Sequence, residues 1–398
     1  MAIPAPAFSH DDITQGNLKA NGINIHYVEQ GEGPLVVMCH GFPESWYSWR
    51  HQLPALAAAG YRAVALSMRG YGLTDAPHDV DAYSIHHLIG DVTAVVRGLG
   101  EETAVVVGHD WGAPVAWYSA LTRPDMFRAV ACLSVPFTPA VGGLPDGVTV
   151  NGLMEMNAGP EREYYRLYFQ EPGVAEADLE SDVRRNVLGF LYSVSGDAVR
   201  NGDLESGWDG HFPKGETMSQ QMIVPETLPS WLSQDDVDFY VAEVERTGFR
   251  GGLNWYRNIN KLPGALAPCV GTTIKQPSMY MGGSTDLIAG NTRRISPPCK
   301  WRWPISGVTR SSRVPAIGCS RNSQPRSTPL WCRSSPVSTN QSSVPPKRSC
   351  PPEAPSRCLR KTIWLVWLGA RGPRRSGGRR RLPSCGTPLQ PSRDRWSR

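Results

Sequence analysis

The stretch TAVVVGHDWGAPVAWYSALTRP, residues 103–124, decides the fold of this chain. It opens with an apolar run of the kind found in strands that are buried on both faces, as strands of parallel sheets are. The run ends at the glycines of GHDWG (108–112), and a segment with helical spacing of its apolar residues follows. The sequence therefore predicts a buried strand, a tight turn and a helix in immediate succession.

Three further apolar runs have the same character: LVVMC (35–39), RAVALSM (62–68) and RAVACLSV (128–135). Helical patterns stand between these runs, at 48–60, 83–100 and 111–124. Strands that alternate with helices in this way predict an α/β protein with a mainly parallel sheet and helices on both faces. The alternating segment GINIHYVEQG (22–31) predicts an antiparallel strand at the edge of this sheet.

The charge of the chain changes abruptly near residue 292. Residues 1–292 carry 18 Lys and Arg against 34 Asp and Glu, whereas residues 293–398 carry 23 against 2. The second part also holds six of the nine cysteines and no histidine. A shift of this size marks a boundary, and we expect 293–398 to be an unstructured tail.

Several classes of function find no support in the sequence. No run of 18 or more apolar residues occurs, so we expect no membrane span. P-loops, dinucleotide fingerprints and metal-spaced histidines are missing, so we expect no cofactor and no metal. The tail holds only three lysines, so we expect no nucleic-acid partner. The N-terminus lacks a signal-peptide pattern, and we expect a cytoplasmic protein, with a homodimer as one option for its assembly.

The central residue of GHDWG is Asp110, which stands where the nucleophilic serine stands in G-x-S-x-G proteins. Gly108 and Gly112 lack a Cβ, which lets neighbouring backbone approach the turn closely and exposes the side chain between them. A carboxylate is ionised at neutral pH, and it can attack carbon directly to form an ester. The alternative is an aspartate that only caps the following helix.

A second motif, His40-Gly41-Phe42-Pro43, follows the first of the buried strands. In a sheet of this architecture that loop lies beside the turn after the third strand. The backbone N–H groups of Phe42 and Trp111 are then placed to form an oxyanion hole. An ordinary strand-ending turn is the alternative, since Gly and Pro are common in turns.

The motifs HGFP (40–43), RGYGLTD (69–75) and GHDWG (108–112) occur in this order along the chain. Together they resemble the epoxide hydrolases of the α/β-hydrolase family, and the resemblance runs from about Asn21 to Ile288. It implies that Asp110 attacks an epoxide carbon to form an ester, which water then cleaves. His40 and His109 are expected to maintain the geometry of the loop and of the turn, respectively.

The resemblance also implies two tyrosines that hold the epoxide oxygen. The stretch YYRLYFQEPGVAEADLE (164–180) resembles the first tyrosine motif at Tyr165, and GGLNWYRNI (251–259) resembles the second at Tyr256. A phenol can donate a hydrogen bond to the oxygen on which charge develops. For any single tyrosine in an aromatic-rich helix, core packing is the alternative.

An acid that orients the catalytic histidine is implied as well. Asp286 follows a predicted strand in QPSMYMGGSTDLIAG (276–290), at the position of the family's acid. A plain turn aspartate is the alternative. With this acid, the resemblance divides the chain into residues 1–136 as the first part of an α/β-hydrolase core, 137–261 as a helical lid, 262–292 as the continuation of the core, and 293–398 as the tail.

The general base is missing from this sequence. The family places a histidine after the acid, in a phrase such as GHW, but the last histidine here is His211. Back-translation of residues 314–335, read one base earlier, can give AGHWLQQEQPAEVNAALVQVL, a string that this protein does not contain. We infer a frameshift near 291–294, in the gene or in its record, and sequencing across codons 285 to 320 tests it. A genuine disordered basic tail that binds nucleic acid is the alternative.

These features predict an enzyme that opens a small apolar epoxide with water, although the chain as written lacks the base that would hydrolyse the ester efficiently. A haloalkane dehalogenase is one alternative, with Trp111 as a halide donor. Such an enzyme commonly has asparagine in the place of Phe42 and needs no tyrosine pair. A fluoroacetate dehalogenase would more often have arginine in the place of Trp111. A catalytically dead α/β-hydrolase-like binding protein is the alternative of a different class, and the missing base favours it.

Overall fold

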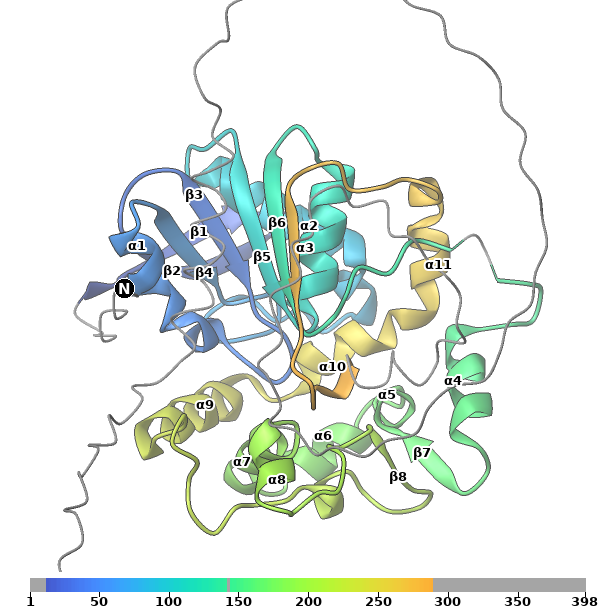
Figure 1. Cartoon of the computed structure of the whole chain (residues 1–398). Helices are drawn as coiled ribbons and strands as arrows, with labels where there is room; N and C mark the ends of the chain where they lie inside the picture. Colours follow the sequence, from blue (N-terminus) through green and yellow to red (C-terminus); the bar gives the residue numbers. More distant parts are fainter. Residues whose placement is uncertain (1–11, 142–143, 289–398) are drawn as a thin grey trace, which may run out of the picture.

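A seven-stranded sheet runs through the computed structural model of the chain, which describes residues 12–141 and 144–288 (Figure 1). In spatial order its strands are β1 (Thr14–Ala20), β2 (Ile23–Gln30), β4 (Arg62–Leu66), β3 (Leu35–Cys39), β5 (Ala104–His109), β6 (Phe127–Leu133) and β9 (Ser278–Met281). The pairs β1–β2 and β2–β4 are antiparallel, and the remaining pairs are parallel. The mainly parallel sheet predicted from the apolar runs is therefore confirmed.

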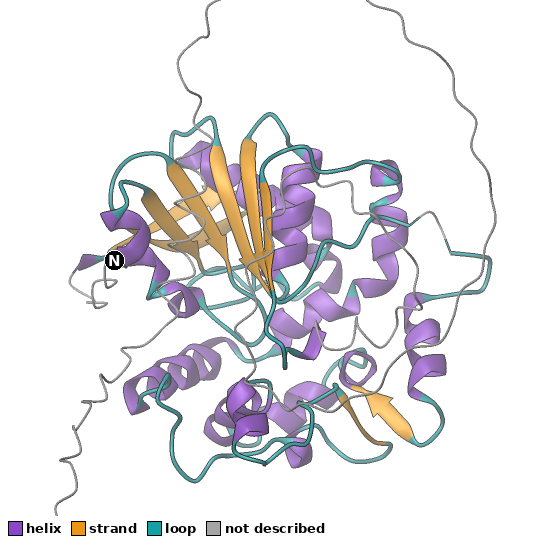
Figure 2. Ribbon diagram, viewed as in Figure 1, coloured by secondary structure: helices purple, strands orange, loops and turns teal. Residues whose placement is uncertain are grey.

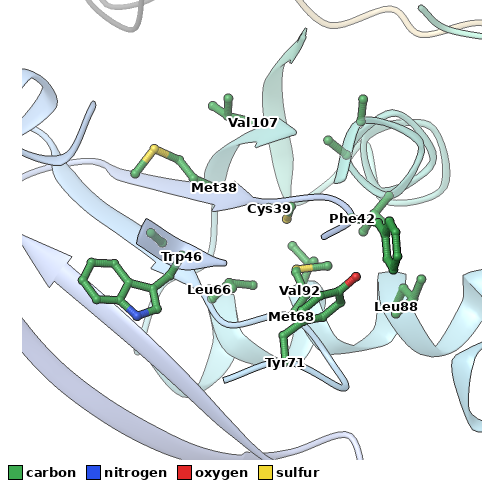
Figure 3. Close-up of a cluster of buried hydrophobic side chains, with 14 of the residues drawn as sticks. Met38, Cys39, Phe42, Trp46, Leu66, Met68, Tyr71, Leu88, Val92 and Val107 are labelled. Atoms are coloured by element: carbon green, nitrogen blue, oxygen red, sulfur yellow. The ribbon is translucent and has the colours of Figure 1, made fainter. Parts of the chain in front are cut away.

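The central strands are apolar because both of their faces are covered. Every residue of β3 is buried, and so are the first five residues of β5. Val37 of β3 lies opposite Val106 of β5, and neither residue is exposed to solvent. Branched side chains pack well on such a pleated, buried surface. Figure 3 shows part of this core, in which the labelled side chains are Met38, Cys39, Phe42, Trp46, Leu66, Met68, Tyr71, Leu88, Val92 and Val107.

Helices α1 (Gln52–Ala58), α2 (Ile85–Gly98) and α3 (Gly112–Thr122) flank the sheet, with α1 on one side and α2 and α3 on the other (Figure 1). Helix α2 begins at Ser84, whose side chain accepts a hydrogen bond from the backbone N–H of His87. This bond satisfies one of the free amide groups at the helix start. Helix α3 packs against β3, β5 and β6. This packing fixes the preceding turn at the carboxyl end of the central strand β5.

The segment between β6 and β9 is largely helical, and most of it lies beyond the carboxyl ends of the parallel strands (Figure 2). Its elements are α4 (Val150–Ala158), β7 (Arg162–Tyr164), α5 (Tyr165–Tyr168), α6 (Val174–Leu179), α7 (Val183–Ser193), α8 (Gly196–Arg200), β8 (His211–Pro213), α9 (Gln234–Thr247), α10 (Arg250–Arg257) and α11 (Leu262–Ala265). Strands β7 and β8 form a small antiparallel ribbon. We refer to 137–261 as the lid, and its boundaries stay a prediction.

Short 3₁₀ turns complete the described elements: η2 (Trp46–Trp49), η3 (Val80–Tyr83), η4 (Ser219–Gln221), η5 (Ile259–Lys261) and η6 (Ala267–Cys269). Across residues 12–141 and 144–288, no helix is both long enough and apolar enough to cross a membrane.

One prediction about the sheet is wrong. The segment 22–31 does form an antiparallel strand, β2, but the edge of the sheet is β1, which pairs with β2 along its whole length. The residues of β1 are mostly polar or partly exposed, so this strand gives almost no hydrophobic pattern. The signal that announces it is the turn Asn21–Gly22, whose residues both have positive φ, as two-residue hairpin turns require.

The predicted tail, 293–398, lies outside the described residues. The inferred frameshift near 291–294 and the end of the part 262–292 lie outside them as well. The described remainder of that part contains β9 and Asp286, and the domain boundaries stay a prediction.

Candidate active site

Asp110 lies in the tight turn between β5 and α3, and its backbone φ is 48°. Residues other than glycine seldom adopt this left-handed conformation, and such strained positions cluster at functional sites. The turn depends on its flanking glycines. A Cβ on Gly108 would lie 2.0 Å from the carbonyl oxygen of Gly112, and a Cβ on Gly112 would lie 2.1 Å from that of Cys39. The N-cap position of α3 is Trp111 and has no side-chain capping bond, so Asp110 is not the cap.

The backbone N–H groups predicted as an oxyanion hole bind the carboxylate of Asp110 itself. The N–H of Phe42 donates to Asp110 Oδ1 at 2.9 Å, and the N–H of Trp111 also donates to this carboxylate. Burial raises the pKa of Asp110, while His109 and the two amides oppose that rise, and the result is a pKa above the usual value. The two amides therefore hold and orient a shielded carboxylate.

His40 links the loop after β3 to the loop after β4. Its Nδ1–H donates to the carbonyl oxygen of Gly41 at 2.8 Å, and its Nε2 accepts from the backbone N–H of Met68 at 3.0 Å. Burial lowers the pKa of His40 to about 4, so the ring is neutral at physiological pH. Both ring nitrogens of His40 are thus engaged by backbone groups, which links the two loops.

His109 forms an ion pair with Glu44, the residue after HGFP. The distance between His109 Nδ1 and the Glu44 carboxylate is 3.0 Å, and Glu44 also accepts the N–H of Gly41 at 2.9 Å. Burial acts to lower the pKa of His109, but Glu44 raises it to about 9. Burial acts to raise the pKa of Glu44, and His109 holds it below its usual value. This pair ties the loop after β3 to the turn that carries Asp110.

The two predicted tyrosines come from different lid helices and meet near Asp110. Tyr165 begins α5, Tyr256 lies in α10, and their ring centres are 5.8 Å apart. The ring of Tyr256 also lies 5.2 Å from that of Trp111 and 5.4 Å from that of Phe42. Burial is the main cause that raises the pKa of both phenols, so both are protonated hydrogen-bond donors at neutral pH.

A cavity of about 300 Å³ lies beside Asp110 and Trp111. Its wall is mostly apolar, with side chains such as Ile85, Val135, Met154 and Leu266. Of the described residues that line it, only Asp110 and Arg166 carry a charge. Tyr165 and Tyr256 are not part of the wall, but each contacts a residue that is. An apolar chamber of this size with a few polar groups suits a small organic molecule.

Asp286 lies in the turn after β9, where the sequence predicts the acid. Its Oδ1 accepts a hydrogen bond from Ser134 Oγ at 3.1 Å and another from the backbone N–H of Ile288 at 2.9 Å. Its charge also acts on His109, whose pKa it helps to raise. The sequence as written has no histidine after Asp286, where the predicted base would stand.

Two polar side chains of the site were missed in the analysis of the sequence. Glu44 stands one residue after HGFP, and Arg166 stands between the tyrosines of YYRLYF. The signal for Arg166 was a lone cation within an aromatic stretch that was already expected to face the substrate. Charged residues are mostly exposed, so one that faces an apolar cavity points to a specific contact there.

A family model described as "alpha/beta hydrolase fold" matches residues 34–309. Epoxide hydrolase A of Mycobacterium tuberculosis (strain ATCC 25618 / H37Rv) is 40% identical over 285 residues, which cover 70% of this chain and 84% of that protein. Epoxide hydrolase 1 of Siraitia grosvenorii is 39% identical over 279 residues, which cover 70% of this chain and 82% of that protein.

Solved structures give the same result. An epoxide hydrolase from an endophytic Streptomyces is 44% identical, with a TM-score of 0.67, and the match covers 72% of this chain and 83% of that one. Epoxide hydrolase A from Mycobacterium thermoresistibile is 38% identical, with a TM-score of 0.64, over 71% of this chain and 85% of that one.

Proposed function

The chain belongs to the epoxide hydrolases of the α/β-hydrolase fold, and from that premise we propose that it opens an epoxide through an ester of Asp110. A carboxylate oxygen of Asp110 attacks one carbon of the three-membered ring. The new ester bond forms as the ring C–O bond breaks, and its electron pair moves onto the ring oxygen. A tyrosine phenol gives its proton to that oxygen, which leaves a hydroxyalkyl ester and a tyrosinate.

The second half of the reaction hydrolyses the ester. Water, activated by a base, attacks the ester carbonyl, and the N–H groups of Phe42 and Trp111 stabilise the oxyanion that forms. The C–O bond of the ester then breaks, the vicinal diol leaves, and Asp110 retains one oxygen from the water. Asp286 is the acid that would orient the base. The sequence as written has no histidine after it, and a shifted reading frame would supply one.

One observation supports this proposal more than any other. The carboxylate of Asp110 is held by two backbone N–H groups at a strained turn, and it borders an apolar cavity. The orientation of the carboxylate is thus fixed before a substrate arrives, which removes part of the entropic cost of attack. The protonated phenols of Tyr165 and Tyr256 lie one contact away from the same cavity. We assign them the role of donors to the ring oxygen.

Incubation with styrene oxide and, separately, with 1-bromobutane tests the proposal. For the chain as written we expect one equivalent of styrene oxide bound covalently, slow diol formation and no bromide release. For a protein expressed from the restored reading frame we expect catalytic diol formation. Bromide release would favour the haloalkane dehalogenase alternative. Neither adduct, diol nor bromide would favour the binding-protein alternative.

Two finer predictions accompany this proposal. A cytoplasmic location is checked by fractionation of the source cells, and a homodimer is checked by light scattering of the purified chain.

A further inference from the structure

Arg166 is partly buried, and its contacts differ from those of the most buried arginines in the described residues. Three arginine side chains with 9% exposure or less each pair with a carboxylate: Arg50 with Asp236, Arg69 with Asp91, and Arg257 with Glu176. Arg166 lines the cavity beside Asp110, yet it forms no ion pair with any carboxylate that the structure describes. A mostly apolar cavity wall solvates a guanidinium less well than bulk water does, so placing one there without a counter-charge costs free energy and calls for a function.

The contacts of Arg166 are with tyrosines. Its Nε–H donates a hydrogen bond to Tyr165 Oη at 3.0 Å. Its guanidinium carbon lies 5.6 Å from the ring centre of Tyr165 and 5.7 Å from that of Tyr164. Because Tyr165 Oη accepts this bond, the phenol proton itself is directed elsewhere and is free to be given to a ligand.

Tyr256 has a different environment. Within residues 12–141 and 144–288, its hydroxyl has no cationic hydrogen-bond donor comparable to Arg166. Burial is the main cause that raises the pKa of both phenols. For Tyr165, Arg166 is the largest charge effect and acts to lower the pKa, and it also gives a hydrogen bond. For Tyr256, Tyr165 and Asp110 raise the pKa further, and Arg166, which lowers it, is a smaller effect than either. The two phenols are therefore unequal as acids, although the family resemblance treats them as a pair.

We propose that Arg166 makes Tyr165 the proton donor of ring opening, an inference that rests on the proposed function. When Asp110 attacks, the phenol proton of Tyr165 moves to the ring oxygen, and the negative charge comes to rest on Tyr165 Oη. The existing bond from Arg166 Nε–H then becomes a bond between a cation and an anion, which is stronger than the bond to a neutral phenol. Tyr256 only donates a hydrogen bond, and Tyr165 regains a proton from solvent water.

The test is a double-mutant cycle on the alkylation step. The rate is followed by the change in tryptophan fluorescence, since Trp111 borders the cavity, after rapid mixing with styrene oxide. Intact-protein mass confirms that the adduct forms. We expect Arg166→Gln to slow alkylation about tenfold in the wild-type background and in Tyr256→Phe. In Tyr165→Phe the same substitution has no further effect, because the group that it assists is already gone.

A conservative variant separates assistance of Tyr165 from a structural role. We expect Arg166→Lys to recover part of the lost rate, because an ammonium can also donate to the phenolate. Arg184→Gln is the matched control. Arg184 lies on α7 with its side chain 51% exposed and pairs with Asp238, so removal of its charge leaves the alkylation rate unchanged. Melting temperatures of all variants verify that each chain is folded.

The outcomes are distinct. Equal slowing by Arg166→Gln in all three backgrounds would overturn the inference and leave the proposed function intact. A rate for Arg166→Lys as low as that for Arg166→Gln would also overturn it. A wild-type chain that forms no adduct at all would defeat the proposed function, and the inference with it.

Discussion

The two sides of the candidate site rest on different parts of the sheet. The side that would form the ester is carried by β5, which lies between β3 and β6, and by the loop after β3. The side that would cleave the ester is carried by Asp286 after β9, the edge strand at the end of the described sheet opposite β1. The residues of β3 are all buried, whereas those of β9 are all at least partly exposed.

This difference shows which half of the reaction the chain can be expected to perform. Asp110, the amides of Phe42 and Trp111, and the two tyrosines all lie in the well-packed region that the structure describes. On the other side Asp286, the proposed acid, is present, and the sequence as written has no histidine after it. We therefore expect the chain to form the ester and to stall there.

The largest effect is expected from Asp110→Asn. An amide is a far weaker nucleophile than a carboxylate, so alkylation by styrene oxide should slow by more than about a thousandfold. The measurement is the fraction of protein that carries one substrate mass after a fixed time. Asp286→Asn provides the matched control, because it makes the same chemical change on the other side of the site. If Asp110→Asn forms the adduct at the wild-type rate, Asp110 is not the group that is alkylated, and the division of the site into two sides fails.

The next largest effect is expected from loss of a phenol. Tyr165→Phe and Tyr256→Phe should each slow alkylation by about 10- to 100-fold, since each removes a donor to the oxygen that becomes charged. Rapid mixing with styrene oxide measures the rates. Tyr168→Phe is the control, because Tyr168 packs against Phe212 and Phe169 and has no assigned role. If all three variants react alike, the tyrosines are packing residues only.

A smaller effect is expected on the free energy of unfolding, from the ion pair between His109 and Glu44. The pKa of His109 is raised to about 9 from an ordinary value of 6.5, so the stabilisation is complete below pH 6.5 and is lost as the pH rises through 9. Because the side chain of His109 is 36% exposed, solvent screening limits the loss to about 1 kcal/mol.

Chemical denaturation at pH 6 and at pH 9.5 measures this loss. His109→Gln cannot titrate, and its free energy of unfolding should fall less over the same interval. Glu44 sets the limit at low pH. Because its pKa in the folded protein is lowered, its contribution to stability is lost as the pH falls below its ordinary pKa of 4.5. An identical pH dependence in the wild type and in His109→Gln would show that the pair does not support the loop.

The smallest effect is expected from Asp286→Asn on alkylation. Asp286 is assigned to the second half of the reaction, so the rate of ester formation should change by less than about twofold. In a protein from the restored reading frame, the same substitution should instead slow diol release by at least about tenfold, because the base loses its orienting acid. Comparable slowing of both steps would mean that the two sides of the site are not separable.

The sequence predicts the strands and the turn of the ester-forming side well because their signals are local. Continuous apolar runs specify β3, β5 and β6, and Gly108 and Gly112 specify the turn at Asp110 through contacts that only a missing Cβ permits. The α/β-hydrolase fold expected from these features is confirmed by the family model and by the solved structures. Sequence signals are reliable here because burial on both faces leaves little choice of residue.

Other features depend on contacts between distant segments and were not predicted. The polar strand β1 is held by pairing with β2 and carries no apolar pattern of its own. The ion pair of His109 with Glu44 joins residues 65 positions apart. The bond from Arg166 to Tyr165 joins neighbours, but its meaning depends on the cavity, which forms only when the lid meets the sheet.

The measurement that tests the central claim most directly is the location of the adduct. The chain is incubated with styrene oxide and digested, and fragment-ion masses assign the modified residue. We predict a single modification, as an ester, on Asp110, and its loss on treatment with mild alkali. A modification on any other residue, or rapid diol formation with no detectable ester, would contradict the claim that this carboxylate is the nucleophile.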